Sequence, residues 1–315
     1  MFNKIIRFIT DKNYRFIILL NKGVFNKLDD RKLLERVYEC KFNIKLNLEH
    51  PITFNEKLQW LKLYNRNPLY TTLVDKYRVR DYIANEIGEE YLIPLLGVWD
   101  SPDDIDFDAL PEQFVLKCNH NSGLGMCICK DKSKLDIKKA KKELWKGLKQ
   151  DYYLTLREWP YKDVPRKIIA EQYMVDDSGY ELKDYKFFNF NGIPKFILVC
   201  KDRFAEAGMT EDFFTTEWEH IPVKRPEHDN SVEEIARPFE LEEMLELSKK
   251  LAKDIPFVRT DFYSINGKTY FGEMTFYPAS GMEQFDPPNY DKLLGDWIKI
   301  DKISDNPGVG TITKR

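Results

Sequence analysis

The sequence has no long hydrophobic run and no excess of charge of one sign. None of its segments approaches the ~20 consecutive apolar residues that a membrane-spanning helix needs. Its 49 Lys and Arg residues are balanced by 52 Asp and Glu residues, which gives a formal net charge of −3. A broad nucleic-acid-binding surface is therefore excluded, although a local basic patch is compatible with this balance. We expect no nucleic-acid partner.

Cysteine and histidine are also scarce. The five cysteines are an odd number in a chain of 315 residues, so a disulfide framework is not expected. Free, buried thiols in a reducing cytosol are the simpler interpretation, and we expect a cytoplasmic protein. The four histidines have no neighbours at metal-ligand spacing, and the G-x-S-x-G pattern of serine hydrolases is absent. A Walker A loop and a G-x-G-x-x-G turn are absent too, which excludes P-loop and Rossmann sites.

The sequence does contain enough apolar residues for a sizeable core, since 43% of it is hydrophobic and 14% aromatic. Residues 203–238 are rich in acids and prolines, and we expect an irregular loop there. Helices and hairpins in mixed order favour an α+β fold. The patterns that predict helices cover 51–64, 134–150 and 241–253, and those that predict strands or hairpins cover 91–100, 112–130, 166–175, 184–200 and 259–274.

The N-terminal residues 1–25 mix Lys and Arg with Ile, Phe and Leu. They lack the apolar core and the small-residue cleavage site of a signal peptide. One interpretation is a helix that packs on the protein's own core. The other is a basic amphipathic helix that makes a peripheral contact with a membrane surface.

The stretch "RTDFYSINGKTYFGEM" (259–274) predicts a hairpin that turns at Asn266-Gly267. A regular two-residue turn would place Asp261 and Glu273 on opposite faces. A three-residue loop through residues 265–267, or a bulge, would place them on one face. Two carboxylates on one face are natural Mg²⁺ ligands, and the alternative is a solvated polar face. The odd register would align four polar residues: Arg259, Asp261, Glu273 and Thr275.

Three further segments carry weaker signals. "KCNHNSGLG" places Lys117 before a glycine-containing loop whose backbone amides could hold a phosphate, or it is an ordinary turn. "DKYRVR" (75–80) holds three cations that could reach phosphates, or it is a solvated helix face. "IIAEQYM" ends an apolar strand at Glu171, an acid that could hold a ribose.

These signals fall in an order that resembles the ATP-grasp superfamily. From about residue 50 to residue 300, the chain is most similar to the TupA-like branch, which is found with teichuronopeptide and surface-polysaccharide genes. The resemblance implies two α+β lobes that clamp ATP, preceded by a helical N-terminal region. The implied divisions are 1–95 (helical region with the first ATP-grasp segment), 96–172 (small lid), 173–300 (large lobe with the metal hairpin) and 301–315 (loose tail).

The resemblance also implies roles for individual residues. Arg80 stands where the family usually has a phosphate-contacting Lys, and Lys117 matches the second such Lys. Arg259 matches an arginine near the transferred phosphate. Thr275 stands where the family typically has an Asn as third metal ligand, beside Asp261 and Glu273. The residues that match the ATP site are Ser122, Gly123 and Gly125 of the phosphate loop, Glu171, Gln172 and Met174 of the adenine hinge, and Asp184, with Glu181 as a substitute, at the ribose.

The family chemistry uses ATP and Mg²⁺ to convert a carboxylate to an acylphosphate, which an amine then attacks. By analogy, we expect a uronic-acid carboxylate as acceptor and an amino acid or simple amine as donor, in surface or capsular polysaccharide synthesis. Residues that bind the acceptor are expected in loops 203–238 and 279–290. The alternatives are a glycosyltransferase of the same pathway and a binding protein on a degenerate ATP-grasp fold.

Overall fold

The computed structural model describes residues 2–176, 182–202 and 208–300. The predicted tail 301–315 and the substitute ribose residue Glu181 lie outside the described residues. No helix among the described residues is long and apolar enough to cross a membrane.

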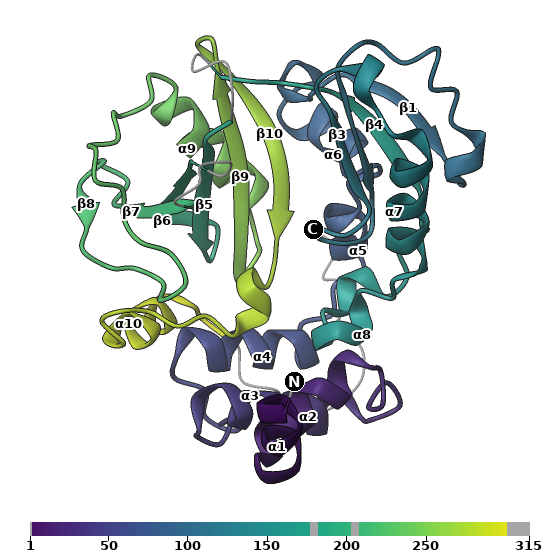
Figure 1. Cartoon of the computed structure of the whole chain (residues 1–315). Coiled ribbons are helices and arrows are strands. Elements are labelled where there is room, and N and C mark those ends of the chain that lie inside the picture. The colour runs from purple at the N-terminus through teal and green to yellow at the C-terminus, as the bar shows by residue number, and fades with distance from the viewer. Residues whose placement is uncertain (1, 177–181, 203–207, 301–315) are drawn as a thin grey trace.

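The N-terminal region is helical, and Figure 1 shows its first four helices beneath the two lobes and the other two beside the smaller lobe. Residues 1–25 form two helices instead of one, because the Asp11 side chain accepts hydrogen bonds from the amides of Asn13 and Tyr14 and starts a second helix. Thr53 caps the helix that follows it through a capping box with Glu56. The helices of this region are α1 (Phe2–Thr10), α2 (Lys12–Asn21), α3 (Asp30–Phe42), α4 (Phe54–Tyr64), α5 (Leu69–Val74) and α6 (Val79–Glu86).

The smaller lobe is an antiparallel sheet of four strands in the order β1-β4-β2-β3. Helix α7 (Ile137–Lys149) covers one face and buries Leu144 and Leu148 against it. The other face is turned towards the larger lobe (Figure 1). The strands are β1 (Leu95–Trp99), β2 (Phe114–Cys118), β3 (Met126–Cys129) and β4 (Ile168–Gln172), and the short helix α8 (Tyr153–Leu156) precedes β4.

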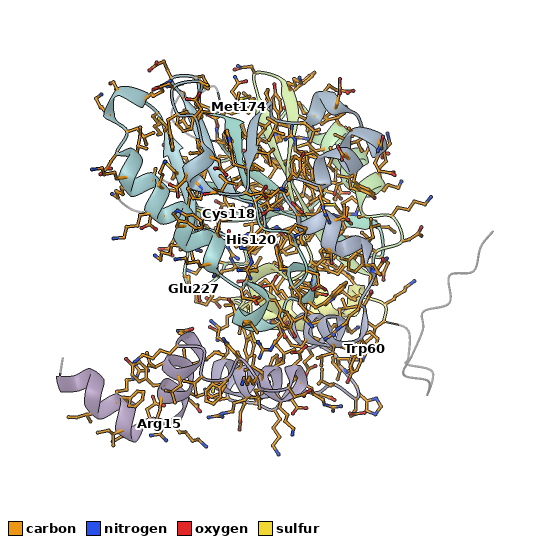
Figure 2. The ribbon with its side chains drawn as sticks, turned by 90° about the vertical axis from the view of Figure 1, so that its right-hand side faces the viewer. Arg15, Trp60, Cys118, His120, Met174 and Glu227 are labelled. Atoms are coloured by element: carbon orange, nitrogen blue, oxygen red, sulfur yellow. The ribbon has the colours of Figure 1, made fainter. Side chains whose placement is uncertain are left out.

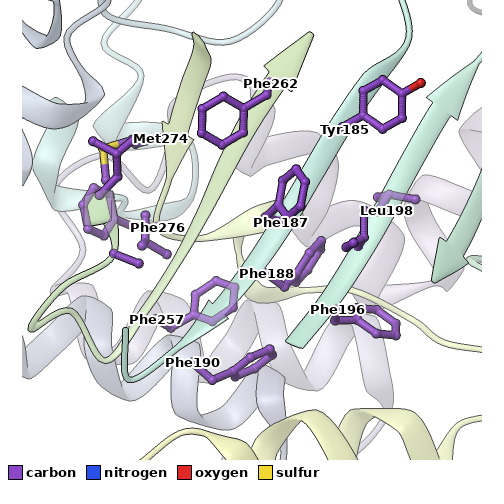
Figure 3. Close-up of a cluster of buried hydrophobic side chains, with 14 of the residues drawn as sticks. Tyr185, Phe187, Phe188, Phe190, Phe196, Leu198, Phe257, Phe262, Met274 and Phe276 are labelled. Atoms are coloured by element: carbon purple, nitrogen blue, oxygen red, sulfur yellow. The ribbon is translucent and has the colours of Figure 1, made fainter. Parts of the chain in front are cut away.

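The larger lobe is an antiparallel sheet in the order β10-β9-β5-β6-β7-β8. Its core is rich in phenylalanine, and Figure 3 shows several of these rings around β5 and β9, with Phe187 and Phe262 in edge-to-face contact at 5.7 Å. The elements are β5 (Asp184–Phe190), β6 (Ile193–Lys201), β7 (Thr210–Phe214), β8 (His220–Ile221), β9 (Phe257–Ile265), β10 (Lys268–Thr275), α9 (Leu241–Leu251) and α10 (Asn289–Trp297).

Helix α9 fixes which face of the large sheet is free. Its Ser248 hydroxyl bonds to Asn189 and Thr260, at 2.8 and 2.7 Å, so this face is buried under α9. Because side chains alternate along a strand, Arg259 and Asp261 point to the opposite face, towards the smaller lobe.

The register of the β9–β10 hairpin decides between the alternatives. Of the two arrangements that would place the carboxylates on one face, the three-residue loop is not the one observed: Ile265 pairs with Lys268, and the turn holds only Asn266 and Gly267, both at positive φ. The odd register arises farther along, where Gly272 is an extra residue between two pairs. Asp261 therefore lies opposite Glu273, which satisfies the condition for a shared face by a bulge instead of a longer loop.

The acidic segment 203–238 is less irregular than expected. Strands β7 and β8 extend the large sheet, and Ile197 pairs with Phe214. The aromatic rings of Phe213 and Phe214 are buried in the core. Packing on the sheet edge thus outweighs the polar composition of the segment.

Candidate functional site

Two carboxylates and an arginine lie together on the face of the large sheet that is turned to the smaller lobe. The Arg259 guanidinium donates two hydrogen bonds of 2.7 Å to Asp261 and one of 3.1 Å to Glu273. It also reaches the Thr275 hydroxyl at 3.1 Å, and that hydroxyl donates to Glu273 at 3.2 Å. The bulge thus gathers all four residues that the sequence placed on one face.

Lys186 of strand β5 is a fifth member of this group and was missed in the sequence. Its ammonium lies 2.7 Å from Asp261 and 3.1 Å from Asp184. Strand β5 pairs with β9 so that Lys186 stands opposite Asp261. Although burial opposes its charge, the two carboxylates raise the pKa of Lys186. Asp184, predicted at the ribose, is buried beside this lysine.

The smaller lobe and the segment before it supply further cations. Lys117 of β2 contacts Glu171 of β4 at 2.6 Å, and Arg80 of α6 reaches the other oxygen of Glu171 at 3.6 Å. Arg80 also donates to the Ile93 carbonyl at 2.9 Å. Glu171 therefore holds both predicted phosphate-binding cations in place.

Lys76 is one of the three cations of "DKYRVR", and the sequence analysis assigned it no role of its own. Its ammonium donates to the Asn121 carbonyl at 2.7 Å, at the start of the glycine loop. Burial lowers the pKa of Lys76, and Glu273 is the first of the charges that oppose this effect. Lys76 also lines a narrow hollow together with Arg80, Lys117 and Gly272. Lys76 therefore contacts the glycine loop, lines the hollow, and interacts electrostatically with Glu273 of the β9–β10 hairpin.

The glycine loop is built for backbone exposure. Gly123 has a φ of +78°, which favours glycine, and a Cβ at this position would meet open space. Gly125, at +72°, packs so closely on Gly147 of α7 that any side chain would collide with it. The exposed Ser122 hydroxyl bonds to Tyr152. Such a loop can close over phosphate oxygens.

A pocket of about 210 Å³ lies between the two lobes, next to Lys117 and Glu171. Its walls include Gln172, Met174 and Asp184, and Figure 2 shows Met174 near the top of the molecule. Met126 and Ile128 of the edge strand β3 remain partly exposed in this pocket. An apolar slot beside a strand edge suits a flat purine ring, which can stack on the walls and bond to backbone groups.

The electrostatics keep the Glu273 carboxylate ionised. Although burial favours the protonated form, Lys76, Arg259 and Lys186 lower the pKa of Glu273 to about 2. Two carboxylates and a hydroxyl form an all-oxygen donor set of the kind that Mg²⁺ prefers when phosphates and waters complete its coordination. The residues therefore fit Mg²⁺, with Asp261 and Glu273 as ligands and Thr275 as the adjacent oxygen. No group of three or more acidic, His or Cys ligands occurs in the described part of the chain, so the protein alone does not form a metal cage.

A second buried cluster, also missed in the sequence, flanks the hairpin. Glu158 contacts the Ser280 hydroxyl, and burial raises the pKa of its carboxyl group. Lys62, fully buried beside it, donates to the carbonyls of Leu156 and Ser280, and burial lowers its pKa to about 8. The charges of Arg259 and Glu273 influence the pKa of Glu158. No spacing in the sequence links these positions, because they meet only through tertiary packing.

Two lobes that face each other across cations, carboxylates and an apolar slot define an ATP-grasp arrangement. The model of the TupA-like ATP-grasp family matches residues 56–299, and the chain belongs to this family. A comparison with curated proteins gives no match.

Several solved structures share the fold at low identity. The D-alanine–D-alanine ligase of Bacillus anthracis is 19% identical over 65% of this chain and 57% of that one, with a TM-score of 0.38. The D-alanine–D-alanine ligase of Helicobacter pylori is 17% identical over 78% and 69%, with a TM-score of 0.42. D-cycloserine synthetase DcsG is 14% identical over 66% and 64%, with a TM-score of 0.38. The chain thus spans little more than half of the Bacillus anthracis ligase, and these likenesses carry no argument about substrates.

Proposed function

We propose that the protein is an ATP- and Mg²⁺-dependent ligase that joins a carboxylate to an amine. The observation that carries the proposal is the alignment of Arg259, Asp261 and Glu273 by the bulge at Gly272, which lines a hollow together with Lys117 of the smaller lobe. Family membership supports the same activity.

The proposed reaction has two steps. A carboxylate oxygen of the acceptor attacks the γ-phosphorus of ATP, and the bond to the bridging oxygen breaks to release ADP. The nitrogen of the amine then attacks the acylphosphate carbon, loses a proton, and expels phosphate to leave an amide. Bound Mg²⁺ supplies charge neutralisation on the phosphate oxygens.

The chain's own residues bind and orient the reactants. Lys117 and Lys76 lie where they can hold phosphate oxygens, with Arg80 behind them. Arg259 stabilises negative charge on the transferred group. Closure of the smaller lobe excludes water, which would otherwise hydrolyse the acylphosphate.

For the substrates, we propose a uronic-acid carboxylate and an amino acid or simple amine, in cytoplasmic synthesis of a surface or capsular polysaccharide. This assignment rests on the branch of the family and on no contact in the structure. A panel of uronic acids and amines, incubated with ATP and Mg²⁺ and analysed by mass spectrometry, tests it through the mass of the amide product.

The same assay separates the alternatives. A glycosyltransferase would turn over sugar nucleotides without ATP, and that result would refute the ligase proposal. A degenerate binding protein would bind ATP tightly and form neither ADP nor amide, for which the replacement of Asn by Thr275 is the supporting observation.

We also propose that the N-terminal residues 1–25 make a peripheral membrane contact. Helix α1 packs on α2 but leaves Ile6 and Ile9 exposed, at 45% and 66%, in a segment that also carries Lys and Arg. Co-sedimentation with anionic vesicles should be lost when residues 1–10 are removed. Equal sedimentation of the shortened chain would contradict the contact.

A further inference from the structure

A partly open cavity lies where the N-terminal helices meet the rest of the chain. This cavity measures about 540 Å³, a volume typical of small-molecule sites. Helices α2 and α3 form one wall, α8 another, and the segments around Arg225 and Met282 complete it. Figure 2 shows Glu227, one of the lining residues, just above the N-terminal helices.

The cavity joins the two loops in which the sequence predicted substrate contacts. Residues 225–228 come from the segment 203–238, and residues 279–283 come from the segment 279–290. The two loops are far apart along the chain, and Lys224 and Asp286 connect them through a pair of backbone hydrogen bonds of 3.0 and 2.8 Å. One cavity therefore gathers both regions.

A thin layer of residues separates the cavity from the metal hairpin. Ala279 lines the cavity, and its neighbour Ser280 contacts Glu158, whose pKa responds to the charges of Glu273 and Arg259. Ala279 and Ser280 both adopt left-handed backbone conformations, with φ of 45° and 53°. This conformation costs about 1 kcal/mol or more per residue, so the surrounding contacts must hold it in place. Lys62 contributes such contacts, to the carbonyls of Ser280 and of Leu156 on the opposite cavity wall.

The polar end of the cavity carries an excess of negative charge. The Arg225 guanidinium bonds to Glu283 at 2.9 Å and also to Glu211, so one cation serves two buried carboxylates. His228 lies 3.8 Å from Glu211 and adds a charge only when it is protonated. At the rim, Lys41 and Glu227 pair with each other at 3.5 Å. Burial raises the pKa of Glu283, and the neighbouring charges of Glu211 and Glu227 act in the same direction.

The rest of the wall is mostly apolar. Leu20 of α2, Val37 of α3 and Met282 are buried or nearly so, and they line the space beside the charged end. Such a site excludes a polar sugar ring and suits a molecule with an aliphatic body and one cationic group.

We propose that this cavity binds a primary ammonium ion that carries an aliphatic group. The ammonium lies against Glu283 and supplies a positive charge, and the aliphatic group packs between Leu20, Val37 and Met282. This binding does not depend on the proposed ligase function.

Equilibrium binding to the full chain without ATP tests the proposal. Isopentylamine, isopentanol and isocaproate share an aliphatic body and differ in charge. Isopentylamine should bind at least about tenfold more tightly than the other two, because a charge-assisted hydrogen bond to a buried carboxylate contributes at least that difference. Tighter binding of isocaproate, equal binding of all three, or no saturable binding of isopentylamine would each overturn the proposal.

Matched Glu→Gln variants locate the site. Glu283→Gln should weaken isopentylamine binding about tenfold and leave ATP binding unchanged. Glu233→Gln, at an exposed position of the acidic segment 203–238, should change neither. If Glu283→Gln binds the amine like the native chain, or if Glu233→Gln weakens it equally, the cavity is not the site.

Alkylation of the half-buried thiol of Cys40 gives a second measurement of amine binding, and it needs no substitution. It lines the cavity, whereas the similarly half-buried Cys127 lies in β3 and serves as an internal reference. Isopentylamine should slow alkylation of Cys40 by iodoacetamide and leave Cys127 unaffected, as measured by peptide mass spectrometry. Equal rates at Cys40 with and without the amine would contradict the proposal. Because neither binding experiment uses ATP, failure of the cavity proposal and failure of the ligase proposal give different results.

Discussion

The charged residues of the site neutralise one another in a way that prepares them for phosphate and metal. Asp261 holds Arg259 and Lys186, and Glu171 holds Lys117 and Arg80. Each carboxylate thus fixes a cation within reach of the cleft before any nucleotide binds. Such preorganisation reduces the conformational entropy that binding would otherwise cost.

Removing a single charge from either lobe should abolish turnover. We expect Lys117→Ala to lose phosphate contact and Glu273→Gln to lose a metal ligand, and each should reduce ATP-dependent amide formation at least about 100-fold. Circular dichroism should show that both variants remain folded. Glu219→Gln, on the far edge of the large sheet, is a matched control that should keep native rates. Native turnover in either site variant would remove that residue from the site.

The pH dependence of stability should report the charge on Glu273. Its pKa lies at about 2 in the folded protein, below the ordinary value of 4.5. Because the folded-state pKa is depressed, this stabilising contribution is complete above pH 4.5 and is lost as the pH falls towards 2. The difference in unfolding free energy between the native chain and Glu273→Gln should therefore be constant from pH 5 to pH 7 and change in favour of the variant below pH 4.5. Urea unfolding at several pH values measures it, and parallel curves down to pH 3 would contradict the assigned shift.

Residues within one strand, or on two strands joined by a short turn, could be predicted, whereas a residue on a strand far away in the sequence could not. Alternation places Arg259 and Asp261 on one face without knowledge of the fold. Lys186 acquires its role only because β5 pairs with β9 at a particular register. Sequence spacing cannot supply that pairing, since the sheet order is set by tertiary packing.

At the scale of elements, the bulge at Gly272 determines whether the hairpin can bind a metal. The turn at Asn266-Gly267 was predicted at its observed position, and its length was left open between two and three residues. The turn can be predicted from the sequence because its residues must adopt positive φ, which restricts the residue types. A bulge requires only one extra residue in one strand, so it leaves no comparable pattern in the sequence. The glycine is the remaining signal, because a Cβ at position 272 would lie 3.0 Å from the Asp261 carbonyl oxygen.

Two changes at this position should have opposite outcomes. Gly272→Val should push the strands apart and weaken Mg²⁺-dependent nucleotide binding about tenfold or more. Deletion of Gly272 should preserve most of the binding, because Phe271 and Glu273 would then pair with Phe262 and Asp261 in a regular ladder. Isothermal titration with and without Mg²⁺ compares the two variants. Loss of binding in the deletion with retention in Gly272→Val would refute the proposed role of the bulge.

At the scale of the whole molecule, the order of the motifs along the chain predicted the fold, and the family match confirms it. The arrangement of the N-terminal helices could not be predicted in this way. Arg157, at a positive φ of 59°, is fully buried and donates to the carbonyls of Phe25, Asn26 and Leu28. These contacts connect α8 to the N-terminal helices across more than a hundred residues. No local pattern encodes them, and the cavity between these parts was equally invisible in the sequence.

Nucleotide binding should close the smaller lobe onto the larger one. The two lobes meet around Lys117, Glu171 and Tyr263, and the β3 residues Met126 and Ile128 remain partly exposed where the adenine would stack. A nucleotide that contacts both lobes stabilises the folded state by about 2.7 kcal/mol at a concentration a hundred times its dissociation constant. We therefore expect ATP with Mg²⁺ to raise the melting temperature by several degrees and to slow amide exchange in β3 and the β9–β10 hairpin together.

The Lys117→Ala variant distinguishes closure of the smaller lobe from nucleotide binding without closure. In Lys117→Ala, the nucleotide would lose its phosphate contact with the smaller lobe and keep those with the larger one. Exchange should then slow in the β9–β10 hairpin and remain fast in β3, as measured by hydrogen–deuterium exchange with mass spectrometry. Gln113→Ala, whose side chain bonds only to the exposed Lys130 carbonyl, should retain protection in both places. Protection of β3 in Lys117→Ala equal to that of the native chain would mean that this lysine does not couple the lobes. Closure would then depend on the glycine loop, which Lys76 holds from the other side through the Asn121 carbonyl.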